Sequence, residues 1–378
     1  MVNIAFTGGG TGGHIYPGLA VASGLKQFSG SQCSIFWIGS SRGNDSSIIK
    51  NAGLEFFGVP SGKLRRYFSL ITIVDFFRLI AGFFASRRIL KQKKAAFLFS
   101  KGGYVSVPPC AAAYSLGIRI FTHESDFSPG LATKINSRFV YKSGGKIFVS
   151  YNETIRFFSD KFRDSIILSG NPVRDSFRNT DAVRGRSFLG LENDSRILLV
   201  LGGSLGAREI NELVRAALHD LTRFYTVVHQ TGPESKWDLQ SGAKYRPYPY
   251  ISDEMPDVLA AAELVLCRSG AGTVWECAVC GKPMLLVPLA GSATRGDQLQ
   301  NALFFEQAGA ALVFTGKTAN PRTLVDAVTE LAHNEDKRAR MSASSLKTTE
   351  LDGTGVIVRV LAGEIPHNKG AYPLEASD

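Results

Sequence analysis

Residues 6–18 constrain this chain more than any other stretch, because they concentrate glycine between a predicted strand and a predicted helix. They read F-T-G-G-G-T-G-G-H-I-Y-P-G, after the apolar run 2–6 and before the apolar-periodic segment 19–25. Glycine allows positive φ and a close approach of the backbone to a ligand. Free N–H groups at a helix N-terminus bind phosphate, so the sequence predicts a site for a phosphate or diphosphate here.

His14 follows this loop directly, at the mouth of the predicted site. An imidazole titrates at about pH 6.5, which suits proton transfer near neutrality. Two further predicted strands, 96–99 and 118–122, lead into Gly102-Gly103-Tyr104 and His123-Glu124. The carboxyl ends of parallel strands meet at one edge of a sheet, where doubly wound domains bind their ligands. We therefore expect these groups to share one rim with His14.

Other interpretations of the glycine loop stay open from the residues alone. The spacing Gly8-x-Gly10-x-x-Gly13 matches a dinucleotide fingerprint, although the predicted second strand 35–38 is not followed by the acidic residue that binds the ribose of NAD. Arg42 would suit the 2′-phosphate of NADP, which would make the protein an oxidoreductase. The loop is also compatible with a plain turn in which His14 only caps a helix.

A second strand, glycine loop and helix begin at residues 197–201, followed by G-G-S-L-G-A-R at 202–208. Two such units about 195 residues apart predict an α/β protein with two Rossmann-like, doubly wound domains facing a cleft. The other strands are expected at 55–59, 147–149, 225–229, 264–267 and 284–287. The turn N-P-V-R at 171–174 separates domains at 1–170 and 171–350, and residues 351–378 are expected to return toward the first domain.

The chain carries 43 Lys and Arg against 33 Asp and Glu, a net charge of +10 that predicts an acidic partner such as nucleic acid, an anionic membrane or a phosphorylated substrate. Residues 63–94 place an apolar run between basic clusters, but Asp75 and Arg78 interrupt it before it could span a bilayer. We expect an interfacial membrane segment, with a buried helix with solvated basic ends as the alternative. The predicted contacts are Phe68, Ile71, Phe76, Phe77, Phe83, Phe84, Arg87 and Arg88.

The predicted strand 264–267 leads into R-S-G-A-G-T-V-W-E at 268–276, a second helix start suited to phosphate, with Glu276 placed to bind sugar hydroxyls. The amide side chains of 297–301 are expected either to bind sugar hydroxyls or to form a solvated helix face. Cys277-x-x-Cys280 has no second ligand pair, so both cysteines are expected to be ordinary helix positions. The sequence contains no D-x-D, so it does not indicate a metal held by paired carboxylates. Scattered cysteines and a 2–6 run too short for a signal peptide predict a cytoplasmic protein.

Together these motifs resemble the MurG family of bacterial glycosyltransferases. The resemblance covers about residues 3–360 and rests on six segments in order: 8–22 (G-G-G-T-G-G-H-I-Y-P-G-L-A-V-A), 101–108 (K-G-G-Y-V-S-V-P), 123–124 (H-E), 170–174 (G-N-P-V-R), 202–211 (G-G-S-L-G-A-R-E-I-N) and 268–276. It implies the GT-B fold and metal-independent, inverting transfer of N-acetylglucosamine from UDP-N-acetylglucosamine, with no other cofactor. The implied acceptor is undecaprenyl-diphosphate-linked muramyl-pentapeptide at the cytoplasmic face of the inner membrane, where the protein would be peripheral; nucleic acid is not an implied partner.

The resemblance also implies roles for individual residues. The catalytic base would be His14 or Glu124. The implied acceptor and diphosphate ligands are Gly9, Gly10, Thr11, Gly12, Gly13, Gly103, Tyr104, His123 and Asp126. The implied donor ligands are Thr11, Gly12, Gly13, Arg174, Ser204, Arg268, Ser269, Gly270, Thr273, Glu276 and Gln298. The chain departs from the family at Asp126, where an asparagine is usual, and at Gly296-Asp297-Gln298, where only the glutamine carries over.

Overall fold

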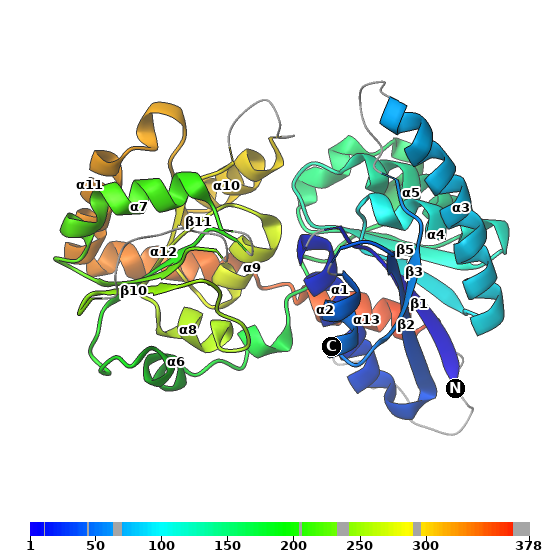
Figure 1. The fold of residues 1–378 in the computed structure, drawn as a ribbon, viewed down its shortest axis with the longest axis horizontal. Coiled ribbons are helices and arrows are strands. Elements are labelled where there is room, and N and C mark those ends of the chain that lie inside the picture. Colours follow the sequence, from blue (N-terminus) through cyan, green and yellow to red (C-terminus); the bar gives the residue numbers. More distant parts are fainter. Residues whose placement is uncertain are drawn as a thin grey trace.

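The computed structural model describes residues 1–10, 12–43, 45–62, 70–203, 206–232, 242–289 and 296–365, with the backbone alone at 70–73. Two parallel sheets stand side by side, and helices cover both faces of each (Figure 1). Strands of such sheets are apolar along their whole length, because both of their faces are buried. This architecture confirms the predicted α/β fold with two Rossmann-like domains.

The first sheet, within the described residues, has seven parallel strands in the order β3-β2-β1-β4-β5-β6-β7. They are β1 (Val2–Thr7), β2 (Cys33–Ser40), β3 (Glu55–Val59), β4 (Phe97–Ser100), β5 (Arg119–Glu124), β6 (Ile147–Val149) and β7 (Ile166–Leu168). At the centre, Ile4 of β1 pairs with Ile35 on one side and Phe97 on the other. The strand order reverses between β1 and β4, which is where doubly wound sheets bind their ligands.

Helices on opposite faces of this sheet bury separate apolar clusters. They are α1 (Gly12–Ser29), α2 (Asp45–Asn51), α3 (Leu70–Lys93), α4 (Val107–Ser115) and α5 (Leu131–Lys142). α1 and α2 pack on one face, and α3, α4 and α5 pack on the other. Short 3₁₀ helices of one or two turns lie at Gly30–Gln32, Tyr104–Ser106, Asn152–Phe157, Asp160–Ser165, Asp175–Phe177 and Gly316–Thr318.

The second sheet has, in the described part of the chain, six parallel strands in the order β10-β9-β8-β11-β12-β13. They are β8 (Ile197–Leu201), β9 (Thr226–Gln230), β10 (Tyr245–Tyr248), β11 (Leu264–Cys267), β12 (Met284–Leu286) and β13 (Ala311–Val313). Its helices are α6 (Ala182–Leu189), α7 (Arg208–Leu221), α8 (Met255–Ala261), α9 (Ala271–Val279), α10 (Asp297–Gln307), α11 (Pro321–His333) and α12 (Glu335–Thr348). α7, α11 and α12 cover one face, and α6, α8, α9 and α10 cover the other.

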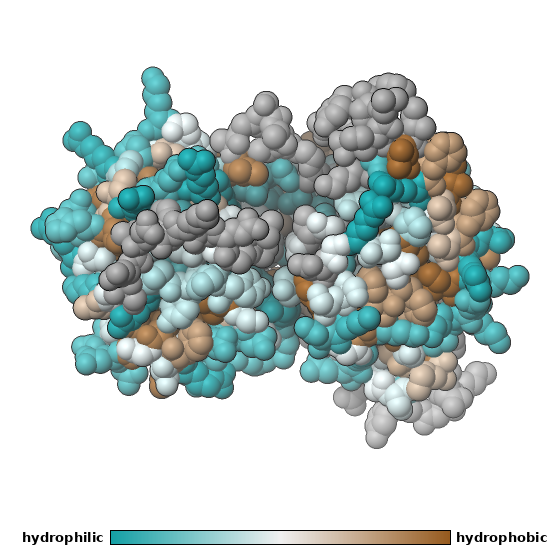
Figure 2. Space-filling model, viewed as in Figure 1, coloured by the Kyte–Doolittle hydropathy of each residue, from teal (hydrophilic) through white to brown (hydrophobic). Residues whose placement is uncertain are grey.

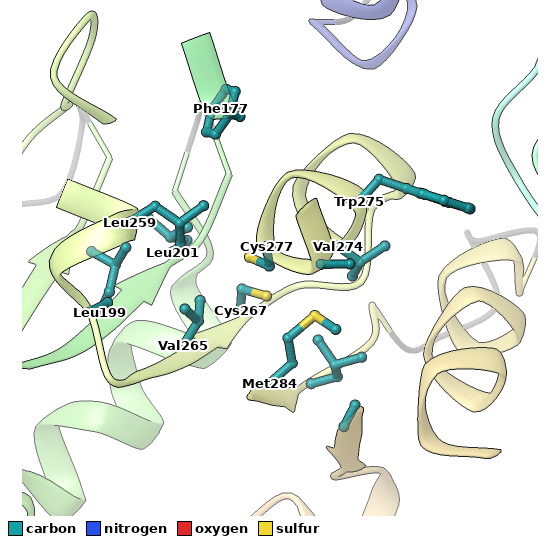
Figure 3. Packing of buried hydrophobic residues seen from close by; sticks show 14 of the residues in the cluster. Phe177, Leu199, Leu201, Leu259, Val265, Cys267, Val274, Trp275, Cys277 and Met284 are labelled. Atoms are coloured by element: carbon teal, nitrogen blue, oxygen red, sulfur yellow. The ribbon is translucent and has the colours of Figure 1, made fainter. Parts of the chain in front are cut away.

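The cluster beneath α9 shows how tightly the second domain is packed. Side chains of the strands point toward Val274 and Cys277 of α9 (Figure 3). Phe177 belongs to the interdomain linker, residues 169–181 between β7 and α6, and joins the same cluster. Cys267 and Cys277 are wholly buried there. A hydrogen bond with Cys267 and burial raise the pKa of the Cys277 thiol well above its ordinary value. A thiol in this setting serves as a packing group. Cys277 lies within α9 as predicted, and Cys280 is the C-cap just after the last helical residue.

The end of the chain returns to the first domain. α13 (Gly353–Ala362) crosses from the second domain and packs against α1 (Figure 1). Ile357 and Leu361 are wholly buried in the same cluster as Ile4 and Phe6 of β1. A Cβ on Gly24 of α1 would lie 3.1 Å from side-chain atoms of α13, so glycine lets the two helices approach closely. The first domain's core is therefore completed by the last helix.

The helix α3 carries an apolar face that no other described element covers. Val74, Phe76, Phe77, Ile80 and Phe84 are 40–64% exposed. Apolar side chains gather along α3 at the right of Figure 2. No helix among the described residues is both long enough and apolar enough to cross a bilayer.

The two charges that interrupt the apolar run of α3 lie off this face. Asp75 is buried and pairs with Arg78 at 3.1 Å. Phe83, which was expected to be exposed, packs inward against the core cluster under α3 instead. Phe68 and the side chain of Ile71 lie outside the described residues.

Replacing Leu361 by Ala should destabilise the first domain, although the residue lies at the far end of the chain. A buried leucine leaves a cavity when truncated, at a cost of about 2–5 kcal/mol. Leu351, which is 44% exposed just before α13, serves as the control and should cost less than about 0.5 kcal/mol. Urea unfolding followed by hydrogen exchange in β1 and β4 measures both effects. Equal losses in the two variants would show that α13 does not support the first core.

Candidate active site

The glycine loop after β1 is held by contacts that leave no room for side chains. Gly9 and Gly10 have φ of 154° and 87°, and the Gly10 N–H donates a 3.0 Å hydrogen bond to Asp45 Oδ2. A Cβ on Gly9 would collide with that oxygen, and one on Gly10 would lie 2.7 Å from the Tyr104 ring. Burial raises the pKa of Asp45, while the bond from Gly10 acts against that rise. Asp45 therefore braces the loop, a role that its sequence distance from the loop conceals.

The ring of His14, in the first turn of α1, rests against the loop that follows β4. A Cβ on Gly103 would lie 3.0 Å from His14 Cδ2, and one on Gly102 would lie 3.9 Å from His14 Nδ1 and from the carbonyl of His123. Gly102 and Gly103 have φ of 84° and 76°, so both require glycine. The structure thus brings the ends of β1, β4 and β5 together, with His14 half-buried between them. Gly12 and Gly13 open α1 beside it.

The pair His123-Glu124 is turned into the protein. His123 is wholly buried, with its Nε2 3.1 Å from the Gly170 carbonyl. Glu124 is 4% exposed, and its two oxygens accept hydrogen bonds from the N–H groups of Asp126 (3.1 Å) and Gly130 (3.0 Å). The structure therefore disfavours His123 as an acceptor ligand and Glu124 as the base, because His123 contacts the chain at Gly170 and Glu124 braces the turn into α5.

The N-terminus of α9 lies at the predicted donor side of the second domain. Its N-cap is Gly270, and among the described residues no side chain caps the first N–H groups. N–H groups in this position can bind a phosphate. Thr273 lies partly buried in this first turn. Ser269 is buried, and its hydroxyl donates to the Gln298 carbonyl at 2.8 Å. Gln298 Oε1 in turn accepts from the Leu289 N–H at 2.9 Å, so this pair fixes α10 beside the helix start.

The two arginines predicted at the donor side have different surroundings. Arg268 donates from Nη1 to the carbonyls of Val287 (3.1 Å) and Pro288 (3.2 Å) and from Nη2 to Glu209 (2.8 Å). Its side chain is only 12% exposed, so it supports the loop after β12. Arg174 remains at the opening between the domains, with its side chain 30% exposed.

Arg174 and Glu276 form an ion pair at 3.3 Å that joins the interdomain linker to α9. The guanidinium lies 4.8 Å from the ring centroids of Tyr16 and Phe177, a cation–π geometry. Burial raises the pKa of Glu276, and the charge of Arg174 acts against that rise. The Glu276 side chain is 23% exposed, so its carboxylate can still accept a hydrogen bond from a hydroxyl. Burial and a hydrogen bond with Tyr16 raise the pKa of Tyr250 to about 12.

Asn301 of α10 links the two domains across the cleft. Its Nδ2 donates to Asp126 Oδ1 at 3.2 Å and to the Ser269 carbonyl at 3.1 Å, and its Oδ1 accepts from the Phe127 N–H at 2.9 Å. The side chain is wholly buried, so this amide of the 297–301 segment neither faces solvent nor is available to a sugar. Asp126 is the position at which the sequence analysis expected an asparagine. Its carboxylate accepts the hydrogen bond from Asn301 that joins the two domains.

A cavity of about 1000 Å³ opens where the linker and α13 join the two domains. It is lined by α1, α2, the linker, the loop after β10 and α13, and it shares Tyr16 and Arg174 with the site described above. The glycine loop and the start of α9 do not line it, so it borders the candidate active site without containing it. Thr11 and Ser204, two further predicted ligands, lie outside the described residues.

Comparisons with known proteins identify the class. The N-terminal domain of glycosyltransferase family 28 matches residues 4–144, and the C-terminal domain of that family matches residues 197–354. Solved glycosyltransferases share the fold: Acinetobacter baumannii MurG superimposes with a TM-score of 0.71 at 24% identity, covering 96% of this chain and 100% of that one. The kitacinnamycin glycosyltransferase gives 0.71 at 15% identity, covering 96% and 99%. The chain is thus built as a GT-B glycosyltransferase.

The curated relatives narrow this class. The UDP-N-acetylglucosamine–N-acetylmuramyl-(pentapeptide) pyrophosphoryl-undecaprenol N-acetylglucosamine transferase of Treponema denticola is 46% identical, over 89% of this chain and 90% of that protein. The proteins of the same name from Treponema pallidum and Clostridium perfringens are 44% and 37% identical, covering 87% and 93% of this chain and 87% and 95% of their own lengths. The chain therefore belongs to the MurG family, as its motifs predicted, and the dinucleotide interpretation of the glycine loop is wrong.

Replacing Asn301 by Asp should open the cleft, because a carboxylate would then face the carboxylate of Asp126 and the carbonyl of Ser269. Small-angle scattering should show a larger radius of gyration, and the double variant Asp126→Asn with Asn301→Asp should restore part of the closure. Asn179→Asp is a matched control, since Asn179 Nδ2 also donates to a carboxylate, Asp175 Oδ2 at 2.9 Å, but within the linker. An unchanged radius in Asn301→Asp would mean that this link does not hold the domains together.

Proposed function

We propose that this chain transfers N-acetylglucosamine, with inversion, from UDP-N-acetylglucosamine to the C4 hydroxyl of undecaprenyl-diphosphate-linked N-acetylmuramyl-pentapeptide. The product is the β-1,4-linked disaccharide on its lipid carrier, a precursor of peptidoglycan. The observation that carries the proposal is the 46% identity, over 89% of the chain, with a transferase named for this reaction. Two anion-binding loops that face one cleft agree with one substrate on each domain.

On the acceptor side, residues 1–170 bind the lipid-linked sugar, and the glycine loop with the start of α1 receives its diphosphate. His14 accepts the proton of the attacking hydroxyl, since its ring is half-buried at the rim while the oxygens of Glu124 are both engaged by backbone N–H groups. The hydroxyl oxygen then bonds to the anomeric carbon, and the bond from that carbon to the UDP oxygen breaks. The departing UDP keeps the electron pair.

On the donor side, residues 171–350 bind UDP-N-acetylglucosamine. The uncapped N–H groups of α9 receive the diphosphate and stabilise the charge that develops on it as UDP leaves. Glu276, one turn further along, accepts hydrogen bonds from the ribose hydroxyls. Arg174 pairs with the same carboxylate at 3.3 Å, so the ribose hydroxyls and the guanidinium share Glu276.

We also propose that the protein is peripheral and docks on the cytoplasmic face of the bacterial inner membrane through α3. The exposed apolar side chains of this helix are followed by Arg87, Arg88 and Lys91, which are also exposed. Aromatic groups that enter the headgroup region beside cations that meet anionic lipid are typical of interfacial helices. This docking would present the first domain to an acceptor anchored in the same membrane.

Replacing His14 by Ala should lower kcat by about 10²–10⁴-fold, the usual contribution of general-base catalysis, while the donor KM changes less than about threefold. The assay follows transfer of radiolabelled N-acetylglucosamine to a synthetic acceptor with a shortened lipid. His219, which is exposed near the end of α7, is the control for loss of an imidazole and should be replaceable at full turnover. A His14→Ala enzyme with nearly normal kcat would remove His14 from the base role. Wild-type protein that fails to use UDP-N-acetylglucosamine would refute the proposed reaction.

The double variant Phe77→Ser with Phe84→Ser should lose at least about tenfold in affinity for vesicles that contain anionic lipid, because burying a phenylalanine contributes about 1.5–3 kcal/mol. Val183→Ser with Leu346→Ser is the control, since both residues are similarly exposed on the second domain. Co-sedimentation with vesicles of phosphatidylglycerol and phosphatidylcholine measures the binding. Added salt should weaken the wild-type interaction. Equal binding of both double variants would exclude α3 as the docking face.

A further inference from the structure

Lys101, the first residue after β4, is a buried cation that the reaction scheme above does not use. It is 1% exposed, and its N–H continues the pairing with β1 by donating to the Thr7 carbonyl at 2.7 Å. The Cβ of Lys101 lies close to two glycines, Gly8 in the glycine loop and Gly18 in α1. A Cβ placed on Gly8 would be 3.0 Å from it, and a Cβ placed on Gly18 would be 3.6 Å from it. The Cβ of Lys101 therefore lies directly against the glycine loop and α1.

The ammonium of Lys101 has no hydrogen-bond partner in the part of the chain that the structure describes. Lys282, the comparable lysine of the second domain, donates from Nζ to the carbonyls of Ala260 (2.7 Å) and Ala262 (2.9 Å). A buried charge without a partner is strongly unfavourable, and such groups persist where a ligand or a reaction uses them. Among the described residues the ammonium of Lys101 lacks a hydrogen-bond partner, whereas that of Lys282 has two.

The charged and titratable groups around Lys101 come from every element that meets at the rim. His14 lies on α1, Asp45 at the start of α2, and Tyr104 after β4. His123 and Glu124 end β5, and Asp126 follows them. The carboxylates of Glu124 and Asp126 favour the charged form of Lys101. Burial, and after it the charge of Lys101, hold the pKa of His123 well below its ordinary value. Both carboxylates are already bonded, Glu124 to backbone N–H groups and Asp126 to Asn301.

We propose that Lys101 is a positioning residue of the acceptor site, whose unpartnered ammonium balances the charge of the acceptor's diphosphate from beneath the Gly8–Gly10 loop. This rests on the function proposed above and adds a residue to it. Lys101 does not touch the acceptor, because it is buried; its charge acts through the loop whose N–H groups make the contact. The energetic cost of the orphaned ammonium is offset only when the diphosphate is bound.

This arrangement makes acceptor binding depend on a proton. Burial lowers the pKa of Lys101 to about 8 in the free protein, against the opposing charges of Glu124 and Asp126. A bound diphosphate favours the ammonium and so raises that pKa in the complex. Below pH 8 the free enzyme already carries the proton, so affinity is constant there. Above pH 8 it must take up a proton to bind, and the acceptor KM should rise toward about tenfold per pH unit.

The test compares the wild-type enzyme with Lys101→Met, which keeps the length of the side chain and removes its charge. At pH 7 the acceptor KM of the variant should be about tenfold higher or more, and the rise above pH 8 should be lost, because no ammonium remains to titrate. The kcat and the donor KM should change less than about threefold. Unchanged acceptor KM and pH profile in Lys101→Met would overturn the proposal, and so would a loss confined to kcat.

Titration calorimetry with the short-lipid acceptor, in two buffers of different ionisation enthalpy, gives an independent measure. At pH 8 the wild type should take up about half a proton more than Lys101→Met on binding. Lys282→Met is the matched control, and it should keep the wild-type pH profile and proton uptake. Equal uptake in wild type and Lys101→Met would overturn the proposal. Turnover by the wild-type enzyme in the KM assay tests the proposed function separately from Lys101.

The stability of the variant excludes misfolding as the cause. The pKa of Lys101 in the folded protein lies below its ordinary value of 10.5, so the folded state binds this proton more weakly than the unfolded state does. The ammonium therefore destabilises the fold below pH 8, and this cost disappears as the pH rises from about 8 to 10.5. Lys101→Met should raise the Tm at pH 7, with a smaller difference at pH 10. A lowered Tm at pH 7 would contradict the orphaned ammonium on which the proposal rests.

Discussion

Burial of both faces of each parallel sheet is the constraint on which the rest of this structure depends. Strands such as β8, buried at all five residues, carry no side chain that could reach a ligand. The helices that cover the sheets leave the loops beyond the carboxyl ends of the strands as the place for binding groups. Glycine at those loops leaves the backbone free to approach a ligand, and side chains around it, such as Asp45, hold the backbone in place. Both halves of the cleft follow this scheme.

The central strands could be predicted from the sequence because burial makes them continuous apolar runs. β6, β8 and β11, which lie inside the sheets, begin and end at the predicted residues, and so does β3, although it is an edge strand. β7, β10 and β13 were missed, and they are the other edge strands of the two described sheets. An edge strand is half-exposed and needs no apolar run, and β10 even contains Pro247.

The direction of each side chain at the site could not be predicted in the same way. Motifs locate a residue at a strand end, but whether its side chain faces the cleft depends on neighbours far away in the sequence. His123 points at the carbonyl of Gly170, and Asn301 joins Asp126 across the domains. Lys101 belongs to a motif that the sequence analysis recognised, yet its isolation is visible only once β1, β4 and β5 are assembled. Whether such a side chain faces a ligand or supports the neighbouring backbone is decided by packing, which depends on many residues at once.

The return of α13 to the first domain has a consequence for how the protein is made. The first sheet is complete at Leu168, but the helix that closes its core begins at Gly353. About 185 residues separate the two points, and at the usual speed of translation they take roughly 10–40 s to synthesise. Throughout that interval the surface formed by α1 and β1 has no α13 to cover it. A ribosome-bound chain therefore holds an unfinished first domain until its second domain has been synthesised.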